Sequence, residues 1–357
     1  MKNFDHGGNV FSVARSLGVK PEEILDFSAS INPLGISPAV RGALLSSIDR
    51  LTHYPDSDAA ELKEALAAIH GLDESAVCVS NGSTELIYLL PRLLGGKRAL
   101  VVAPAFSEYA KALAREGWAV AYLDLAPRNG FDLPLDLLEE RLGEGFDALF
   151  LCNPGNPTGR LIPPATVEKV CDLCRSHGAF LVLDEAFMDF CEEGSAKRLV
   201  VAGGGVVLRS MTKFFAIPGL RLGYALGPAA VVADLAALRE PWSVNTHAQA
   251  AGLAALSDRD YRERTVRFIA GERAFLATSL AALPGLRPYP SAANYLLVEI
   301  EGGHSATELR ERLLGRRMLI RDCSTFHGLS DRFFRVAVRG REENERLAEQ
   351  LAEVLRA

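Results

Sequence analysis

A lysine with two polar neighbours carries the strongest chemical signal in the sequence. Lys213 stands in the segment SMTKFF, three residues after Ser210 and eight before Arg221. Aromatic and apolar neighbours desolvate a lysine, which lowers the pKa of its amine and favours the neutral form that forms a Schiff base. A hydroxyl and a guanidinium suit a phosphate. The segment therefore predicts an imine-forming lysine beside a phosphate site, in preference to an ordinary surface lysine.

Three further segments carry polar side chains directly after predicted apolar strands. LVLDE delivers Asp184, SNGSTE places Ser83 and Thr84 at a helix start, and NPGNPTG holds Asn156 in an extended turn. A helix start offers free N–H groups to an anion, and X-Pro steps prevent helix. Each segment alone is explained as well by a helix cap or a plain turn. An open α/β sheet, however, binds its ligands where its strands end.

The elements that must position these residues alternate between short apolar strands and helical stretches. Such alternation predicts an α/β fold with a large domain whose mostly parallel sheet is flanked by helices. Expected helices include Thr84–Leu93, Ser107–Glu116 and Pro164–His177. The expected strands are Val77–Ser80, Ala99–Ala103, Ala119–Leu123, Ala148–Cys152, Ala179–Leu183, Val206–Arg209 and Gly223–Leu226.

The last third of the chain predicts a smaller α+β domain. A long helical stretch from about Asp260 to Leu283 precedes expected strands and helices at Tyr295–Ile300, Ala306–Leu314, Met318–Arg321, Phe333–Val338 and from Glu342 onward. The glycine pair in HGGN and the turn NPLG indicate an irregular start. We therefore divide the chain into an N-terminal arm packing with the small domain (1–45), a large domain (46–265) and a small C-terminal domain (266–357).

Composition excludes several classes of protein. The 357 residues include 45 acidic and 39 basic side chains, which argues against a nucleic-acid binder. No apolar run approaches the roughly 18 residues that span a bilayer, and the first residues lack a signal-peptide core. We expect a cytoplasmic protein without membrane contact. Cys171 and Cys174 are expected to be small buried residues of a helix, with no metal bound.

Together these motifs resemble those of the fold-type I pyridoxal-phosphate enzymes of the aspartate aminotransferase superfamily. The motifs are NPGNPTG, the strand-borne DEAF, and S-x-x-K followed by RLGY. The resemblance covers nearly the whole chain and implies pyridoxal 5'-phosphate as the cofactor of the large domain. It implies that Lys213 carries the cofactor as an imine, that Asp184 pairs with the protonated pyridine nitrogen, and that Asn156 bonds the ring hydroxyl.

The same resemblance assigns the rest of the cofactor site. Phe106, in PAFSEY, matches the aromatic residue stacked on the cofactor ring. Tyr54, in HYPD, matches a tyrosine that reaches the phosphate in the neighbouring subunit. This match implies a homodimer with shared active sites. The residues implied to hold the phosphate within one subunit are Ser83, Thr84, Ser210 and Arg221.

Motifs near the two ends of the chain indicate which family within the superfamily the chain resembles. HGGN near the start and FRVAVR near the end resemble the threonine-phosphate decarboxylase family of cobalamin biosynthesis, a relative of the histidinol-phosphate aminotransferases. The implied reaction converts L-threonine O-3-phosphate to (R)-1-amino-2-propanol O-2-phosphate. Two guanidiniums suit the two anionic groups of this small-molecule substrate. The residues implied to bind it are His6, Gly7, Ser30, Asn32, Asn156, Arg321 and Arg335.

Two departures from the relatives' pattern bear on the reaction. Ser30 stands where they usually carry asparagine, and Phe187 stands where many aminotransferases carry tyrosine. Transamination moves a proton between Cα and the cofactor, and decarboxylation does not need that step, so Phe187 favours a decarboxylase. One alternative is a histidinol-phosphate or aromatic aminotransferase. Another is a catalytically idle regulator, against which the complete lysine, aspartate and asparagine set argues.

Overall fold

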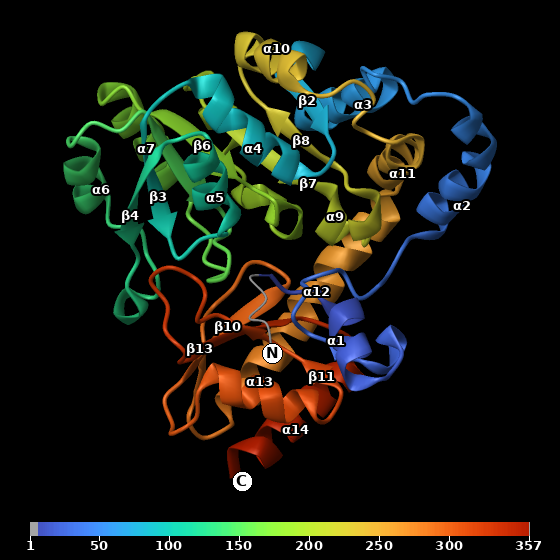
Figure 1. Cartoon of the computed structure of the whole chain (residues 1–357), viewed down its shortest axis with the longest axis vertical. Helices are drawn as coiled ribbons and strands as arrows, with labels where there is room; N and C mark the ends of the chain where they lie inside the picture. The colour runs from blue at the N-terminus through green and yellow to red at the C-terminus, as the bar shows by residue number, and fades with distance from the viewer. Residues whose placement is uncertain (1–5, 357) are drawn as a thin grey trace.

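A seven-stranded sheet forms the core of the upper half of the molecule in Figure 1. The computed structural model describes residues 6–356. The strand order is β2-β8-β7-β6-β5-β3-β4, in which β8 is antiparallel to both neighbours and the other pairs are parallel. The strands span Val77–Ser80 (β2), Arg98–Ala103 (β3), Ala119–Asp124 (β4), Ala148–Cys152 (β5), Phe180–Asp184 (β6), Val206–Ser210 (β7) and Gly223–Leu226 (β8).

Continuous apolar runs form this sheet because helices cover both of its faces. Along β5, Phe150 contributes to one apolar cluster while Leu149 and Leu151 contribute to the other. The first face packs against α4 (Ser83–Leu94), α5 (Glu108–Arg115) and α10 (Ala229–Leu238). The second layer comprises α3 (Ala60–His70), α6 (Leu135–Leu142), α7 (Pro164–Ser176), α8 (Lys197–Ala202), α9 (Met211–Phe214) and α11 (Thr246–Ser257).

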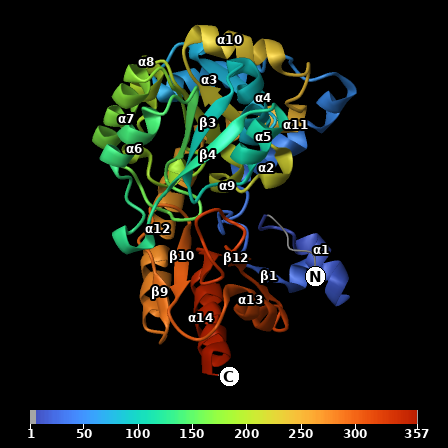
Figure 2. The same ribbon diagram turned by 60° about the vertical axis from the view of Figure 1, so that its left-hand side comes forward.

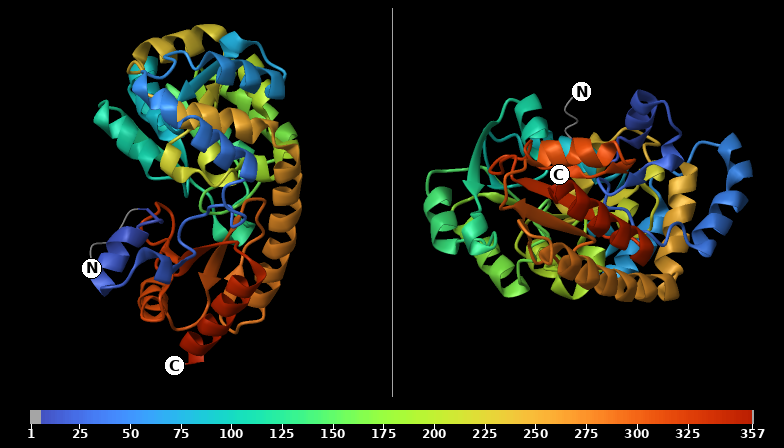
Figure 3. Two further views of the ribbon diagram at one scale, coloured as in Figure 1. Left: turned by 90° about the vertical axis from the view of Figure 1, so that its right-hand side faces the viewer. Right: turned by 90° about the horizontal axis from the view of Figure 1, so that it is seen from below.

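A smaller antiparallel sheet forms the lower half, in the order β12-β13-β10-β9. The long helix α12 runs along one side of the molecule and joins the two halves (Figure 3). The predicted α/β fold, with a mostly parallel sheet and a smaller α+β unit, is confirmed. The elements here are α12 (Arg259–Ala281), β9 (Leu286–Pro288), β10 (Tyr295–Ile300), α13 (Ala306–Leu314), β12 (Arg321–Asp322), β13 (Phe333–Ala337) and α14 (Arg341–Arg356).

The start of the chain is more regular than expected. Helix α1 (Val10–Leu17) ends at Gly18, which takes the left-handed conformation with φ 67°. Helix α2 (Pro38–Ser46) begins after Ser37, whose side chain accepts a hydrogen bond from the Val40 N–H group. The expectation of an irregular arm is therefore wrong in these two places, where cap residues flank short apolar stretches.

The arm touches both halves of the molecule. Strand β1 (Leu25–Asp26) pairs in parallel with β11 (Met318–Leu319), and α1 lies beside the small sheet (Figure 2). Helix α2 packs against α11 of the upper half. The arm thus crosses from one half to the other. Residues 1–5 of the predicted arm lie outside the described part of the chain.

One predicted strand is two strands. The stretch Met318–Arg321 was expected to be continuous, but β11 pairs with the arm while β12 pairs with β13. The chain changes partner at Ile320, which a periodic apolar pattern does not reveal. The change matters because Arg321 and Arg335 become direct cross-strand partners. Their side chains therefore project from the same face of the small sheet.

No helix within residues 6–356 is long and apolar enough to cross a membrane. The six cysteines are free and buried. Cys171 and Cys174 lie on the inner side of α7, as predicted.

Candidate active site

A cavity of about 210 Å³ lies where the strands of the large sheet end and the small sheet begins. We call it the main cavity. It gathers side chains from the arm, the large sheet and the small sheet. Those that were predicted from the sequence are His6, Gly7, Ser30, Ser83, Thr84, Phe106, Asn156, Asp184, Lys213, Arg321 and Arg335. Its other lining residues are Ser28, Ala29, Ile31, Tyr109, Cys152, Ala186, Phe187 and Phe326.

Lys213 lies in α9, immediately after β7. Its Nζ donates a hydrogen bond to Ser210 Oγ at 2.9 Å and lies 5.4 Å from the centre of the Phe187 ring. Burial lowers the pKa of Lys213 to about 8, against the raising effect of the Asp184 carboxylate; the Arg221 and Arg335 guanidiniums add to the lowering. The neutral, nucleophilic amine is therefore available only slightly above neutral pH.

Asp184 ends β6 and is 5% exposed. Its Oδ1 accepts a hydrogen bond from the Ala186 N–H group at 2.9 Å, and its Oδ2 accepts one from the Tyr109 hydroxyl at 2.5 Å. Burial raises the pKa of Asp184, while the Tyr109 hydrogen bond and the Lys213 charge oppose that rise. The sequence analysis did not identify Tyr109. The sequence feature that could have pointed to Tyr109 is its position three residues after Phe106.

The start of α4 forms an anion cradle. Ser83 and Thr84 occupy its first turn, where backbone N–H groups are free of intrahelical partners. Gly82 has φ 75°, and a Cβ there would lie 2.7 Å from Nη2 of Arg221. The missing side chain lets the Arg221 guanidinium lie against the helix start. Arg221 does not line the main cavity, but its guanidinium lies close to Gly82, which directly precedes the first turn of α4.

The two arginines of the small sheet are held by different partners. Arg335 donates hydrogen bonds to Asn156 Oδ1 and, at 3.1 Å, to the Ser28 carbonyl. Its guanidinium also lies 4.9 Å over the Tyr295 ring. Arg321 donates to Thr325 Oγ1 at 2.8 Å, with its guanidinium 5.2 Å from the Phe326 ring. Both guanidiniums are thus held in place by neighbouring groups, and both arginines line the main cavity.

The HGGN segment of the arm closes one side of the main cavity. The His6 ring bonds Glu108 at 2.8 Å and lies 5.4 Å from the Phe106 ring. A Cβ on Gly7 would lie 2.1 Å from the Ser28 carbonyl oxygen, so this close approach requires glycine. The segment therefore links the arm to the large sheet's helix α5.

Four predicted site residues do not line the main cavity, namely Asn32, Tyr54, Ser210 and Arg221. Ser210 bonds Lys213 and Arg221 lies at the start of α4, whereas Asn32 and Tyr54 lie elsewhere. The Asn32 amide group donates to the Phe214 carbonyl at 2.8 Å, to Tyr261 and to Thr265, and it does not line the main cavity. Because these internal bonds use its side chain, the structure does not bring Asn32 to a substrate. Tyr54 is 78% exposed and stacks on Trp242 with ring centres 4.6 Å apart. It therefore lies outside the site of its own chain.

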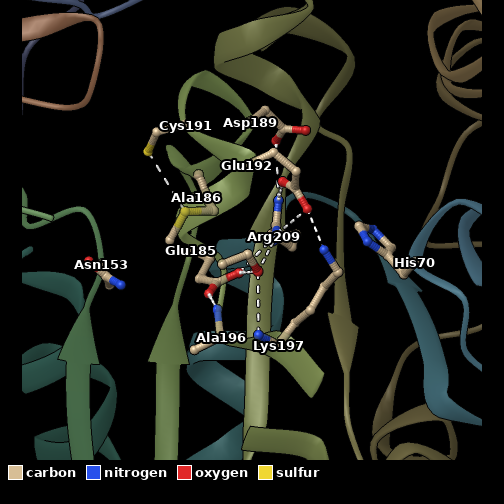
Figure 4. Close-up of polar contacts among 12 residues, drawn as sticks. His70, Asn153, Glu185, Ala186, Asp189, Cys191, Glu192, Ala196, Lys197 and Arg209 are labelled. Atoms are coloured by element: carbon tan, nitrogen blue, oxygen red, sulfur yellow. Dashed lines mark hydrogen bonds and ion pairs between the residues drawn. The ribbon is translucent and has the colours of Figure 1, made fainter. Parts of the chain in front are cut away.

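Behind the site, a buried charge cluster joins the ends of β6 and β7 (Figure 4). Arg209, fully buried, contacts Glu185 at 2.9 Å, Glu192 at 2.7 Å and Asp189 at 3.8 Å. Arg209 precedes Ser210, and Glu185 follows Asp184. Neighbouring residues of a strand face opposite sides, so the cluster lies on the other side of the strands from Ser210 and Asp184. From that side it anchors the strands that carry the site residues. The sequence analysis did not predict it, because each charge alone is typical of a surface.

These side chains fit pyridoxal phosphate. An amine with a lowered pKa, a buried carboxylate and an amide line one cavity, beside a helix start with an added guanidinium. Two buried polar atoms there, Ser30 Oγ and Arg335 Nε, have no hydrogen-bond partner. Such unpaired groups are costly unless a bound molecule satisfies them. The set therefore suits a phosphorylated carbonyl cofactor together with an anionic substrate.

Comparison with known proteins identifies the family of the chain. Residues 22–351 match the model of the family described as aminotransferase class I and II. The chain is 42% identical to the threonine-phosphate decarboxylase of Salmonella typhimurium, in a match covering 99% of this chain and 97% of that protein.

Two solved structures have the same fold. The L-threonine-O-3-phosphate decarboxylase from Porphyromonas gingivalis superimposes with a TM-score of 0.83 at 27% identity, covering 94% of this chain and 100% of that chain. The histidinol-phosphate aminotransferase from Clostridium acetobutylicum superimposes with a TM-score of 0.86 at 27% identity, covering 93% and 99%. The shared fold does not separate these two reactions. With the family match spanning both sheets, the chain belongs to the class I and II aminotransferase family.

Proposed function

We propose that the chain is a pyridoxal-phosphate-dependent decarboxylase of L-threonine O-3-phosphate. The products are carbon dioxide and (R)-1-amino-2-propanol O-2-phosphate, which supplies the aminopropanol side chain in cobalamin biosynthesis. The observation that carries the proposal is the pair of guanidiniums, Arg321 and Arg335, at opposed positions of β12 and β13 in the same cavity as Lys213. The 42% identical Salmonella typhimurium decarboxylase supports it.

Several residues would hold the cofactor. Lys213 would bind its aldehyde carbon through the amine, Asp184 would pair with the ring nitrogen, and Asn156 would bond the ring hydroxyl. Phe106 stacks on the ring. When bound, pyridoxal phosphate accepts the electron pair left when a bond to the substrate Cα breaks. The residues that hold its phosphate are Ser83, Thr84, Ser210 and Arg221.

The arginines select which bond breaks. Arg335 contacts Asn156 beside the cofactor position, so we assign it the substrate carboxylate. Arg321 also lines a small side cavity with His6, Asn9, Arg310 and Thr325, so we assign it the substrate phosphate. Holding both anions would fix the substrate in one orientation, so that binding energy would decide which bond to Cα breaks.

Two phenylalanine rings and the Lys213 amine account for the remaining needs of the reaction, which are a dry cavity and a proton donor. Phe187 and Phe326 present apolar rings to the main cavity and exclude water from it. Phe187 has no hydroxyl with which to bond the cofactor. After carbon dioxide leaves, the Lys213 amine is placed to return a proton to Cα. The aminotransferase alternative uses the same cofactor residues but would break the Cα–H bond of its substrate instead of the Cα–carboxylate bond.

We also propose a homodimer with shared sites. Tyr54 and Trp242 form an exposed aromatic pair, and Leu45, Ile48 and Leu51, which precede Tyr54 in the chain, are also exposed. A second copy is the occupant that would cover this apolar surface and receive Tyr54 at its phosphate cradle. The division into an arm (1–45), a cofactor domain (46–265) and a small domain (266–357) is part of this proposal. Buried, free cysteines support a cytoplasmic location.

The test uses threonine phosphate without any keto-acid acceptor. A decarboxylase releases carbon dioxide through many turnovers, whereas an aminotransferase stops after one half-reaction. We expect continued release of carbon dioxide and accumulation of aminopropanol phosphate. Efficient use of histidinol phosphate with 2-oxoglutarate, together with inert threonine phosphate, would overturn the proposal in favour of the aminotransferase.

A further inference from the structure

The burial of Asp184 and its proposed role require opposite protonation states of its carboxyl group. The carboxylate is 5% exposed and burial raises its pKa, which favours the neutral acid. Pairing with a cationic ring nitrogen, however, requires the ionised form. The neighbouring groups must therefore donate the hydrogen bonds that water donates to an exposed carboxylate. Two donors do so, namely the Ala186 N–H group on Oδ1 and the Tyr109 hydroxyl on Oδ2.

Tyr109 is held rigidly for this contact. Its side chain is 1% exposed, and its ring lies edge-on to Phe106 at 5.9 Å and 5.8 Å from Phe150. Tyr109 also lines the main cavity from the first turn of α5. Burial and the nearby Asp184 charge raise the pKa of Tyr109 well above its ordinary value. The hydroxyl therefore keeps its proton and acts as a donor throughout the working pH range.

We propose that Tyr109 is a positioning residue of the cofactor site, whose hydroxyl fixes the plane of the Asp184 carboxylate and keeps it ionised toward the cofactor ring nitrogen. The inference deepens the proposed function and rests on it. With one donor on each oxygen, the carboxylate has one orientation and retains free lone pairs for the ring nitrogen. Phe106, which would stack on the ring, and Tyr109, which acts through Asp184, thus lie three residues apart at the start of α5.

The Tyr109→Phe variant tests this role because it removes one oxygen and leaves the ring packing in place. In the full-length cofactor-free protein with ¹³C-carboxyl aspartate, the Asp184 resonance is assigned by its loss in Asp184→Asn. We expect the Tyr109→Phe variant to bind the Asp184 proton about tenfold more tightly, which moves the titration midpoint up by about one pH unit.

In the cofactor-loaded protein, a ¹⁵N-labelled cofactor ring reports its own protonation. We expect the ring-nitrogen signal of Tyr109→Phe to move toward that of Asp184→Asn. The value of kcat should fall about tenfold or more while KM for threonine phosphate changes little, because the substrate anions bind elsewhere.

Tyr224→Phe is the matched control. Tyr224 is also buried, and its hydroxyl bonds His70 at 2.8 Å outside the main cavity. A similar loss of stability in both variants, with the Asp184 midpoint and the ring-nitrogen signal of Tyr109→Phe unchanged, would overturn the proposal. Such a result would show that the Tyr109 hydroxyl only makes a hydrogen bond that stabilises the core.

A second change keeps the test decisive if Tyr109→Phe does not fold. Replacing Tyr109 by 3-fluorotyrosine retains the hydroxyl and strengthens it as a donor, so the Asp184 midpoint should move down. An unchanged midpoint would contradict the proposal. The titration of the cofactor-free protein does not depend on the substrate. A shifted midpoint with inert threonine phosphate would therefore leave the Tyr109 assignment standing and reject only the proposed reaction.

Discussion

At Lys213, the fold changes the chemistry of one amine by removing water from it. Burial lowers the pKa to about 8 even though the Asp184 carboxylate opposes the shift. Unfolded lysine keeps its proton up to about pH 10.4. Between these values the unfolded chain binds more protons, so the contribution of Lys213 to the free energy of unfolding rises with pH. The same shift provides a neutral nucleophile near physiological pH.

A pH profile of cofactor capture checks this shift. We expect the rate at which cofactor-free protein binds pyridoxal phosphate to rise with pH and level off above about pH 8, because the neutral amine reacts. Borohydride should then fix the cofactor on Lys213, as peptide mass analysis would show. Fixation on Lys111 or Lys169, or a profile that rises only near pH 10, would contradict the assignment.

The two arginines predict separable kinetic defects. Removing a charge-assisted hydrogen bond costs about 1.5–3 kcal/mol, or roughly ten- to a hundredfold in rate or affinity. Arg335→Gln should mainly lower kcat, because Arg335 orients the carboxylate bond. Arg321→Gln should mainly raise KM, because Arg321 captures the phosphate. Steady-state kinetics with threonine phosphate measure both, and the reverse pattern would exchange the two roles.

At the scale of elements, the ends of β6 and β7 are joined by buried charges. Arg209 on β7 and Glu185 after β6 are both fully buried and 2.9 Å apart. Their neighbours in sequence, Ser210 and Asp184, belong to the site. The backbone ladder sets the spacing of the two strands, and the charge cluster adds a side-chain contact between their ends.

Removing one charge of this cluster should be costly. Arg209→Ala leaves buried carboxylates without their cation, which typically costs about 3–5 kcal/mol. Urea unfolding of the cofactor-free protein measures the change. Arg175→Ala is the matched control, since its exposed pair with Asp172, 3.2 Å apart, resembles surface pairs that contribute about 0–1 kcal/mol. Equal effects of the two changes would show that the cluster does not anchor the strands.

At the scale of the whole molecule, the site depends on residues distant in sequence. The arm supplies His6, the large sheet supplies Asp184 and Lys213, and the small sheet supplies Arg321 and Arg335. Tyr54 is exposed and absent from its own chain's main cavity. A second chain would complete this set.

Mixing two variant subunits tests whether a second chain completes the site. If Lys213→Ala and Tyr54→Phe are each severely impaired, mixed dimers contain one site with both native residues. We expect activity to return on mixing, up to about a quarter of sites for random pairing at equal amounts. Two Lys213→Ala preparations mixed together serve as the blank. A fully active monomer in sedimentation would contradict the shared site.

The fold class could be predicted from the sequence alone, and so could the strand ends at which the proposed cofactor residues lie. Strands of consecutive apolar residues need cover on both faces, which predicts a helix-flanked sheet wherever that sheet lies. Asp184 ends such a strand, and Asn156 and Lys213 come within a few residues of one, so their position near the strand ends is a local property of the chain. The line-up of these residues along one edge then follows from parallel pairing.

Only the tertiary structure decided which distant residues meet. The pairing of Arg321 with Arg335 depends on a strand break at Ile320 that no periodicity signals. Asn32 and Tyr54 match the family motif, yet one bonds the core and the other faces outward. The Tyr109–Asp184 bond joins helix and strand residues 75 positions apart. Hydrogen bonds of this kind depend on angles and distances between packed elements, and sequence spacing carries no record of those.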